Sequence, residues 1–516
     1  MDIRSIIITF ILILPSSLMA KAQLTPRETM LHVFNRFAYG PRPEDAAQML
    51  ADLKKTKARL DAWFEQQLKP ELIDDKAVAE KLKDFPRLSQ SILELTQKAT
   101  IMQDDKVQLA AAKAIDRNME LQVQNELSEQ LMQSKVLRSA ESLRQFEAVL
   151  TDFWFNHFNI DGRSQQGKYT TPSYEREAIR PHVFGSFVDL LKATAQHPAM
   201  LRYLGNANSR VMNKKQEGGI NENYARELLE LHTLGIDGGY SQKDVIELAR
   251  IFTGWSLSGP YGGNQFVFKR EWHDTQEKTF LGLKFPAGHA QDEGDRALTI
   301  LAEHPSTARF IAKKLVLAFV DDKGDPALVE KLAQTFIDKK GDLTAVYRTL
   351  YQSPEFWQRE HFNVKFKKPL HYVVSAVRAV DGQMESLNSL PIALKMMGED
   401  LYHYGPPTGY SDSINYWLST NLITQRLIFA NRLVHKNWPG VLVPSEEKEI
   451  STGQELIAFL ENDVLQARLE DASRRAILAA LQTDKLRAGL KNSVNAPIDL
   501  NRYLALALGS PQFQKR

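Results

Sequence analysis

The sequence predicts a mainly α protein, a large multi-helix globular body that carries one small β-hairpin. Apolar residues recur at helical spacing through most of the 516 residues, and residues typical of helix caps separate the helical segments. Alternation typical of strands occurs in one segment, 264–282. The hydrophobic fraction of 43% is enough for a sizeable core.

The first 22 residues have the pattern of a secretory signal peptide. One arginine precedes an apolar run from Ile6 to Leu14, and small residues stand at Ala20 and Ala22. We expect cleavage between Ala22 and Gln23, and therefore a periplasmic or extracellular protein. The alternative is a membrane anchor, but the run is shorter than the roughly 20 residues that a spanning helix needs. We expect no integral membrane segment after cleavage.

Composition excludes several kinds of chemistry. The chain contains no cysteine, which rules out disulfides, thiolate nucleophiles, cysteine-ligated zinc, iron–sulfur clusters and covalently attached haem. The net charge of +2 gives no reason to expect nucleic acid as a partner.

The mature chain is expected to begin with two helices. Thr25, Pro26 and Glu28 form a capping box with proline in the first helical position, and the helix should end by Gly40. A second helix is expected over about 44–68.

The next segment, 88–158, is almost entirely helical in pattern. Its part 101–135 is rich in Gln, Lys, Glu and Ala, which is typical of long exposed helices. Ser139 is expected to cap the helix that ends in "FWFNHFNI".

Helices and one hairpin make up the centre of the chain. A helical block over 174–204 should break near its two prolines, and the helix that Asn221 starts should end at Gly235. Ser241 caps the following helix. The hairpin is expected to pair 266–270 with 278–281.

The mature chain, 23–516, is predicted to be a single helical domain. It would consist of the long helices 88–158, a motif-rich centre over 150–285 and C-terminal helices over 292–516. There is no internal repeat and no low-complexity tract.

The first candidate site residue is His157 in "FWFNHFNI". At helical spacing it shares a face with Phe153 and Trp154, so its imidazole must find hydrogen-bond partners away from water. Two interpretations stay open: a core histidine bonded to a backbone carbonyl, and a ligand or base at the floor of a pocket. Asn156 and Asn159 supply amides that would orient the imidazole or bind a ligand.

The helix "NENYARELLELHTLG" also has two interpretations. Glu222, Arg226 and Glu230 are spaced four residues apart, as in a ladder of surface ion pairs. Glu227 lies between this ladder and the buried stripe, which His232 borders. Either the ladder is purely structural, or one or both of Glu222 and Glu227 face a site.

Two further segments carry candidate polar groups. His273 and Asp274 stand at the predicted hairpin turn, flanked by Arg270, where they would act as acid–base groups, ligate a metal or simply form the turn. Arg180 would hold an anionic group or pair with Glu177.

Nine ordered blocks of the sequence resemble the bacterial domain-of-unknown-function family 1800. The match runs from about Leu31 to the C-terminus. The blocks are "LHVFNRFAYGPRPED", "FWFNHFNI", "YEREAIRPHVFGSFVDLLKATAQHPAMLRYL", "NENYARELLELHTLGIDGGYSQKDVIELARIFTGW", "HDTQEKTFLG", "HPSTARFIAKKLVLAFV", "KFKKPLHYVVSAVRAV", "YGPPTGYSD" and "LALALGSPQFQKR".

This resemblance implies an exported bacterial protein, often encoded beside a sulfatase- or phosphatase-like family numbered 1501. It brings no established reaction. Family members share the pairs Asn156–His157, Asn221–Glu222, Arg226–Glu227 and His273–Asp274. Some members carry Phe in place of His232, which favours a core role for that residue.

Three functions are compatible with these patterns. The first is an extracytoplasmic hydrolase for a glycan or ester, with or without a divalent metal, that uses paired carboxylates or metal-bound water. Its catalytic residues would be His157, Glu222, Glu227, His273 and Asp274, and its substrate-binding residues Asn156, Arg180, Arg226 and Arg270. The second is a non-catalytic binding or scaffold partner of the neighbouring 1501-like protein. The third is a haem or iron oxidoreductase that uses His157 or His273 as a ligand.

Overall fold

The computed structural model describes most of the chain as helices, with short antiparallel strand pairs. The predicted signal peptide lies outside the described residues, as does part of the predicted long helical segment 101–135. The described residues are 23–95, 109–164, 167–211, 219–259, 264–435, 438–444, 450–487 and 498–516. In this part of the chain the mainly α class is confirmed.

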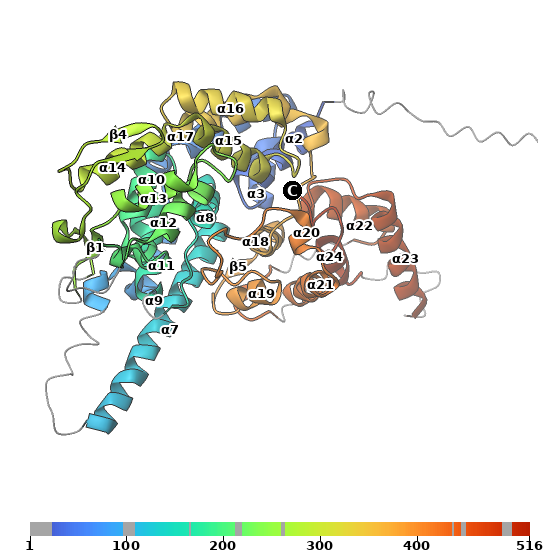
Figure 1. Ribbon diagram of the computed structural model, residues 1–516. Helices are drawn as coiled ribbons and strands as arrows, with labels where there is room; N and C mark the ends of the chain where they lie inside the picture. The colour runs from blue at the N-terminus through green and yellow to red at the C-terminus, as the bar shows by residue number, and fades with distance from the viewer. Residues whose placement is uncertain are drawn as a thin grey trace, which may run out of the picture.

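The helices pack together into a broad body, and one end of α7 projects from it (Figure 1). No helix in the described residues is both long and apolar enough to cross a membrane. The α-helices are α2 (Pro26–Phe37), α3 (Pro43–Leu50), α4 (Thr56–Gln67), α5 (Lys76–Lys81), α7 (Leu109–Glu141), α8 (Gln145–His157), α9 (Gly167–Ser173), α10 (Phe187–Gln196), α11 (Pro198–Tyr203), α12 (Glu222–Glu227), α13 (Gln242–Ile251), α14 (Asp292–Ala302), α15 (Pro305–Phe319), α16 (Pro326–Asp338), α17 (Leu343–Gln352), α18 (Pro369–Ala379), α19 (Leu390–Met396), α20 (Ile414–Trp417), α21 (Thr420–Val434), α22 (Gly453–Phe459), α23 (Asp471–Arg487) and α24 (Leu500–Leu508).

One continuous hydrophobic core joins the two ends of the described chain. It contains residues from Met30 to Phe513. Helix α18 is buried at every position, so it packs on all sides instead of presenting one apolar face. Any polar side chain on α18 must therefore find its partner inside the protein.

Two arginines of helix α2 donate hydrogen bonds to segments far along the chain. The Arg36 guanidinium donates to the carbonyl oxygens of Val320, at 3.0 Å, and His361, at 2.8 Å. The Arg27 guanidinium donates to the carbonyl oxygen of Asn462 at 2.7 Å. The environment of α2 is thus built partly from nearby helices such as α4 and partly from segments more than 280 residues away in sequence.

Local helix signals predicted several of the boundaries, but the single helix expected over about 44–68 is wrong, because that segment divides into α3, the 3₁₀-helix η1 (Leu53–Lys55) and α4. The capping boxes at Thr25 and Ser241 are present, and the block over 174–204 breaks near Pro181 and Pro198, as predicted. The predicted cap at Ser139 is wrong, because α7 continues through that residue and α8 begins only at Gln145.

The strand segments were predicted, but their pairing was not. Instead of one hairpin, the described chain has three antiparallel pairs: β1 (Trp255–Leu257) with β2 (Phe266–Phe268), β3 (Lys278–Phe280) with β4 (Leu283–Phe285), and β5 (Gln383–Met384) with β6 (Val441–Leu442). The predicted hairpin is wrong because β2 pairs with the preceding strand and β3 with the following one.

Two wide helical turns shape the centre of the chain. The π-helix η5 (Tyr174–Ile179) follows α9, and the π-helix η8 (Leu228–His232) follows α12. The extra residue in each turn rotates the side chains that follow it. His232 is consequently buried, whereas Leu231 is only partly buried.

Candidate functional site

His157 lies in the aromatic core. Its ring contacts Trp154 edge-on at 5.3 Å between centroids and Phe158 at 4.4 Å. Its Nε2 donates to the carbonyl oxygen of His232 at 3.1 Å, and burial lowers its pKa well below the usual value. This geometry matches a neutral core histidine bonded to a backbone carbonyl.

The neighbouring asparagines hold a loop in place. The Asn156 amide donates to the carbonyl oxygen of Tyr410 at 2.9 Å, and its own oxygen accepts from the Tyr410 backbone N–H at 2.7 Å. The Asn159 amide donates to the carbonyl oxygens of Tyr404 and Pro406. Both side chains thereby clamp the segment "YGPPTGY" against the end of α8.

Helix α12 carries its charges at the surface. Arg226 lies 3.6 Å from Glu222 and 3.9 Å from Glu230, in the predicted ladder, and Gln242 donates to Glu222 at 2.8 Å. Glu227 is half-buried, and burial together with the charge of Glu230 raises its pKa. Pairs of this kind stabilise a helix by about 0.2–0.5 kcal/mol each.

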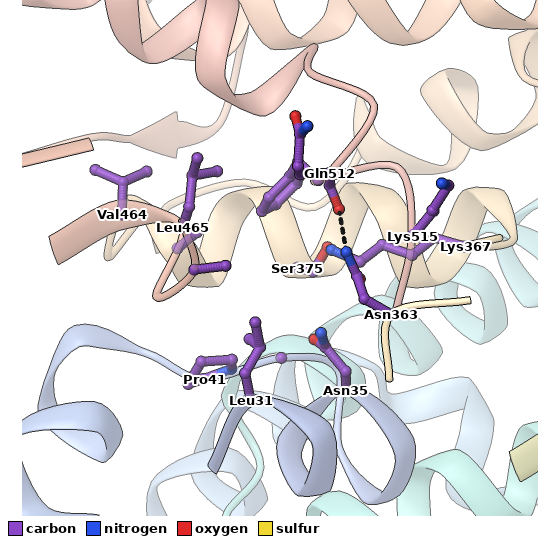
Figure 2. Close-up of a pocket in the computed structure, with 14 residues that line it drawn as sticks. Leu31, Asn35, Pro41, Asn363, Lys367, Ser375, Val464, Leu465, Gln512 and Lys515 are labelled. Carbon is purple, nitrogen blue, oxygen red and sulfur yellow. Dashed lines mark hydrogen bonds between the residues drawn. The ribbon is translucent and has the colours of Figure 1, made fainter. Parts of the chain in front are cut away.

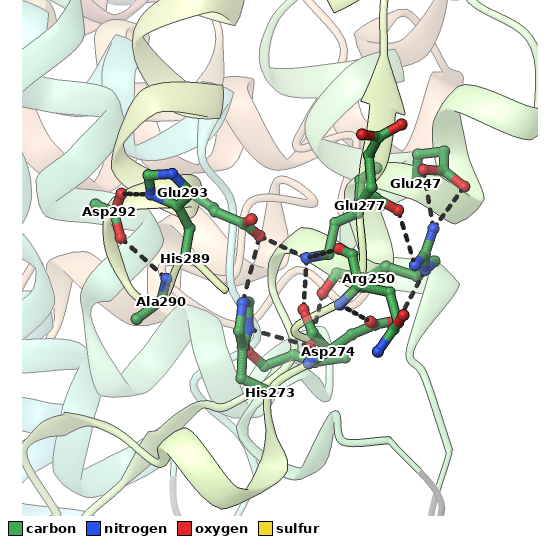
Figure 3. A network of polar contacts seen from close by, with 12 residues as sticks. Glu247, Arg250, His273, Asp274, Glu277, His289, Ala290, Asp292 and Glu293 are labelled. Carbon is green, nitrogen blue, oxygen red and sulfur yellow. Dashed lines mark hydrogen bonds and ion pairs between the residues drawn. The ribbon is translucent and has the colours of Figure 1, made fainter. Parts of the chain in front are cut away.

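His273 and Asp274 belong to a buried polar network between the strand pairs and helices α13 and α14 (Figure 3). The Nδ1 of His273 donates to the carbonyl oxygen of Thr253 at 2.7 Å, and its Nε2 lies 3.3 Å from Oε2 of Glu293. Arg250 donates to the Asp274 carboxylate at 2.7 Å, which holds the pKa of that carboxyl low despite its burial.

Lys278 completes this network. Its ammonium contacts the Glu293 carboxylate at 2.7 Å and also donates to the carbonyl oxygens of Asp274 and Gln276. The side chains of Lys278 and Glu293 are essentially inaccessible to solvent. Arg270, by contrast, is exposed. The network therefore ties the strand pairs to the helical body.

The structure distributes the predicted residues over separate places instead of one pocket. His157 lies in the core, Glu222 and Arg226 lie on the surface of α12, and His273 with Asp274 lies in the network of Lys278. Across the described residues, no three His, Asp or Glu side chains are grouped so that they could hold a metal ion.

Arg180 lines a large cleft, which we call the arginine cleft. Its volume is about 460 Å³, within the range of small-molecule sites. It lies between α5, η3 (Leu82–Asp84), η4 (Pro86–Ser89), α7, α9 and η5. Three guanidinium groups line it, those of Arg138, Arg176 and Arg180. The rest of the lining is mostly apolar and includes Leu82, Phe85, Pro86, Leu88, Leu131 and Pro172.

The three arginines differ in whether they form an ion pair with a carboxylate. Arg180 pairs with Glu175 and not with Glu177 as the sequence suggested, and Arg176 pairs with Glu177. Arg138, within the described part of the chain, has no carboxylate within ion-pair distance. Burial and the neighbouring charge of Arg180 lower its pKa to about 10. Arg138 therefore presents a half-buried positive charge to the cleft.

A buried ion-pair network forms the wall behind the arginines. The Glu175 carboxylate accepts from the Tyr402 hydroxyl and lies 3.7 Å from the ammonium of Lys135. Lys135 in turn pairs with Asp152 at 2.8 Å. Because Glu175 is held by these partners and by Arg180, it does not neutralise Arg138.

The family comparison now decides what the chain is related to. A family model described as "Protein of unknown function (DUF1800)" matches residues 32–515, almost the whole chain. The chain belongs to the DUF1800 family. No curated protein and no solved structure matches it.

In this DUF1800 member, sequence reasoning missed two of the three cleft arginines. Arg138 stands in a long polar helix, where an arginine is ordinarily solvated, and Arg176 is adjacent to acidic residues that would pair with it. A usable signal was the stretch 82–88, "LKDFPRL", in which apolar residues alternate with charged ones and Phe85 is followed by Pro86. Which helix covers that stretch depends on the fold.

Proposed function

We propose that this DUF1800 protein is an exported binding protein whose arginine cleft holds an anionic ligand with an apolar body. The observation that carries the proposal is Arg138, a half-buried guanidinium without a carboxylate partner in the described chain, at the wall of a cleft of about 460 Å³. A buried charge without a partner is costly, so a ligand that supplies the opposite charge gains affinity there.

The lining explains the kind of ligand. A guanidinium is planar and donates two parallel hydrogen bonds to a carboxylate or phosphate. The apolar side chains opposite, such as Phe85 and Leu131, favour a hydrocarbon or ring face over a fully hydrated ion. A small inorganic anion would satisfy only the first of these features.

The positions of the predicted catalytic residues favour binding as the function over catalysis by histidines and carboxylates. The imidazole of His157 is enclosed by Trp154 and Phe158, and Glu222 lies at the surface. Neither arrangement brings an acid and a base to one substrate atom, which acid–base catalysis requires.

The test measures binding of anilinonaphthalene sulfonate, a fluorescent anion with an apolar body, to the purified mature chain. We expect saturable binding that decanoate displaces and decanol does not. Arg138→Gln should weaken the affinity roughly ten- to a hundredfold, because a hydrogen bond to a charged group is worth about 1.5–3 kcal/mol. Thermal unfolding should show that this variant is as stable as the wild type, since no ion pair is lost.

The matched control is Arg226→Gln, which removes the same charge from the exposed ladder on α12. It should bind the probe like the wild type. If decanol displaces the probe as well as decanoate does, or if Arg138→Gln binds unchanged, the proposal fails.

The export of the protein and its partner belong to the same proposal. The residue pattern over 1–22 supports export. The family resemblance supports a neighbouring exported, sulfatase-like protein as the partner, and co-purification of the two tagged proteins is the direct test.

A further inference from the structure

A narrow pocket lies between α2, α18 and the segment 464–467, with residues 512–515 at one side (Figure 2). The space inside is about 20 Å³, enough for one water molecule or the end of a small group. Lys367, Ser375 and Asn35 line it, at its end near α18 and α2. It is separate from the arginine cleft, with which it shares no lining residue.

Lys367 is buried in an unusual way. The residue is only 2% exposed, and its Nζ lies 3.0 Å from Oγ of Ser375. The ring of Phe513 covers it at 3.7 Å. In the described chain, no carboxylate lies within ion-pair distance of Lys367, although buried lysines are rarely found without one.

Burial and nearby positive charges disfavour the charged form of Lys367, although the face of the Phe513 ring favours it. Burial lowers its pKa well below the usual value, and the positive charges of Arg426 and Arg516 lower it further. The hydroxyl of Ser375 donates to the carbonyl oxygen of Tyr372 at 3.0 Å and accepts from the Lys367 amine, so it would have to give up the bond to Tyr372 and turn about its C–O bond before it could react. Rotation would point its hydrogen at the lone pair of the amine.

We infer that Ser375 and Lys367 form a nucleophile–base pair that hydrolyses short-chain acyl esters. The single observation behind this inference is the Lys367 amine donating to Oγ of Ser375 at 3.0 Å at the wall of a pocket, with no carboxylate within ion-pair distance of that amine in the described residues. This activity goes beyond the binding function of the arginine cleft.

The reaction needs only water as a co-reactant. Oγ of Ser375 attacks the ester carbonyl carbon while Nζ of Lys367 takes the hydroxyl proton. The carbon–oxygen bond to the alcohol then breaks, and the alcohol leaves with the proton from Lys367. Water attacks the acyl-serine in the same way, with Lys367 again as the base, and releases the carboxylic acid.

Other residues of the pocket fit this role. The Asn35 side chain, 4% exposed, points into the pocket beside Ser375 and would donate to the developing oxyanion (Figure 2). Gly40 leaves this corner open, because a Cβ there would lie 3.3 Å from Cβ of Ser375 and 3.5 Å from Oδ1 of Asn35. The positive φ of Gly40, 87°, also favours glycine.

The size of the pocket selects the acyl group. With about 20 Å³ inside, it admits an acetyl-sized group and no long chain. The alcohol portion would remain outside, near Asn363 and Lys515 at the polar side of the pocket. Acetyl esters of polar alcohols are therefore the expected substrate class.

The test is covalent labelling of the full mature chain with a fluorophosphonate probe. In the labelled product, Oγ of Ser375 is bonded to phosphorus, fluoride has left, and the proton has passed to Lys367. Peptide mass spectrometry should place the adduct on Ser375, and Ser375→Ala should abolish it. Lys367→Met and Lys367→Arg should each reduce the labelling rate at least about a hundredfold, because general-base catalysis contributes 10²–10⁴-fold.

Ser173→Ala is the matched control. Ser173 is a buried helical serine that donates to the carbonyl oxygen of Thr170 at 2.9 Å, the same local bond that Ser375 makes with Tyr372. It has no lysine partner, so its replacement should leave labelling unchanged. A label on another serine, or unchanged labelling in a folded Lys367→Arg variant, would overturn the inference.

Hydrolysis and access provide independent readouts. The wild type should cleave p-nitrophenyl acetate and leave p-nitrophenyl octanoate almost untouched, and the Ser173→Ala variant should behave like the wild type. Ser375→Cys creates the sole thiol of the chain, so alkylation by iodoacetamide measures access to the pocket. A thiol that stays unreactive in the folded protein would contradict the inference even if other variants fail to fold.

Discussion

Among the described residues, the buried lysines other than Lys367 each pair with a carboxylate. Lys278 has Glu293, Lys135 has Asp152, and each pair lies within 2.8 Å. Lys367 departs from this rule in the described chain, because a hydroxyl and an aromatic ring take the place of the carboxylate. Residues that depart from such a rule are the ones for which a chemical role is worth testing.

Glu399 gives the sharpest prediction for a single residue. Burial and the nearby charge of Asp152 raise its pKa to about 7, while the Leu370 backbone N–H donates to its carboxyl at 2.7 Å. A raised pKa means that the folded protein favours the protonated form. Its contribution to stability is therefore complete below pH about 4.5 and is lost as the pH rises through about 7.

Glu399→Gln should remove this pH dependence, because glutamine keeps the acceptor and cannot ionise. The free energy of unfolding of the wild type should fall by up to about 3 kcal/mol more than that of the variant between pH 4.5 and pH 8. Urea unfolding of both proteins across this range measures the difference. Parallel pH profiles would show that Glu399 does not titrate in this interval.

At the scale of single elements, local signals and long-range partners differ in how well they can be predicted. The capping boxes at Thr25 and Ser241 depend on residues three positions apart, so the sequence was sufficient. The partner of β2 is chosen by packing against distant segments, and the hairpin prediction accordingly failed. The π-turn Leu228–His232 has no dependable local signal, so the sequence could place His232 only at the border of the buried stripe.

The Lys278–Glu293 pair should hold β3 to α14. Glu293→Gln leaves the Lys278 ammonium buried without a counter-charge, so it should lower the free energy of unfolding by about 3–5 kcal/mol. The double variant Lys278→Met with Glu293→Gln should lose clearly less than the sum of the losses in Lys278→Met and Glu293→Gln alone. A double-mutant cycle from urea unfolding measures this coupling, and additive losses would contradict a direct pair.

At the scale of the whole molecule, the fold class was predictable and the composition of the sites was not. Helical periodicity extends over hundreds of residues, so the mainly α class did not depend on any single segment. Lys367 and Ser375 are eight residues apart with Pro369 between them, and only the tertiary fold brings their side chains together. A usable hint was Ser375 within "PLHYVVSAVRA", a helix apolar enough to be buried on all sides.

The proposed export also concerns the chain as a whole. We expect the protein collected outside the cytoplasm to begin at Gln23, because the small residues at Ala20 and Ala22 favour cleavage there. N-terminal sequencing of the protein from a periplasmic or culture fraction measures this directly. As a control, Ala22→Leu should leave the precursor uncut, whereas an uncut wild type in the membrane fraction would indicate an anchor.

The distant partners of α2 have a consequence for the order of events during synthesis. Arg27 and Arg36 donate to oxygens of residues 462, 466, 361 and 320, so this helix cannot reach its final surroundings while the chain is still short. Contacts of such sequence separation slow folding. A nascent chain would therefore stay open until most of it has been made, which is the condition in which a polypeptide can be threaded through a translocation channel.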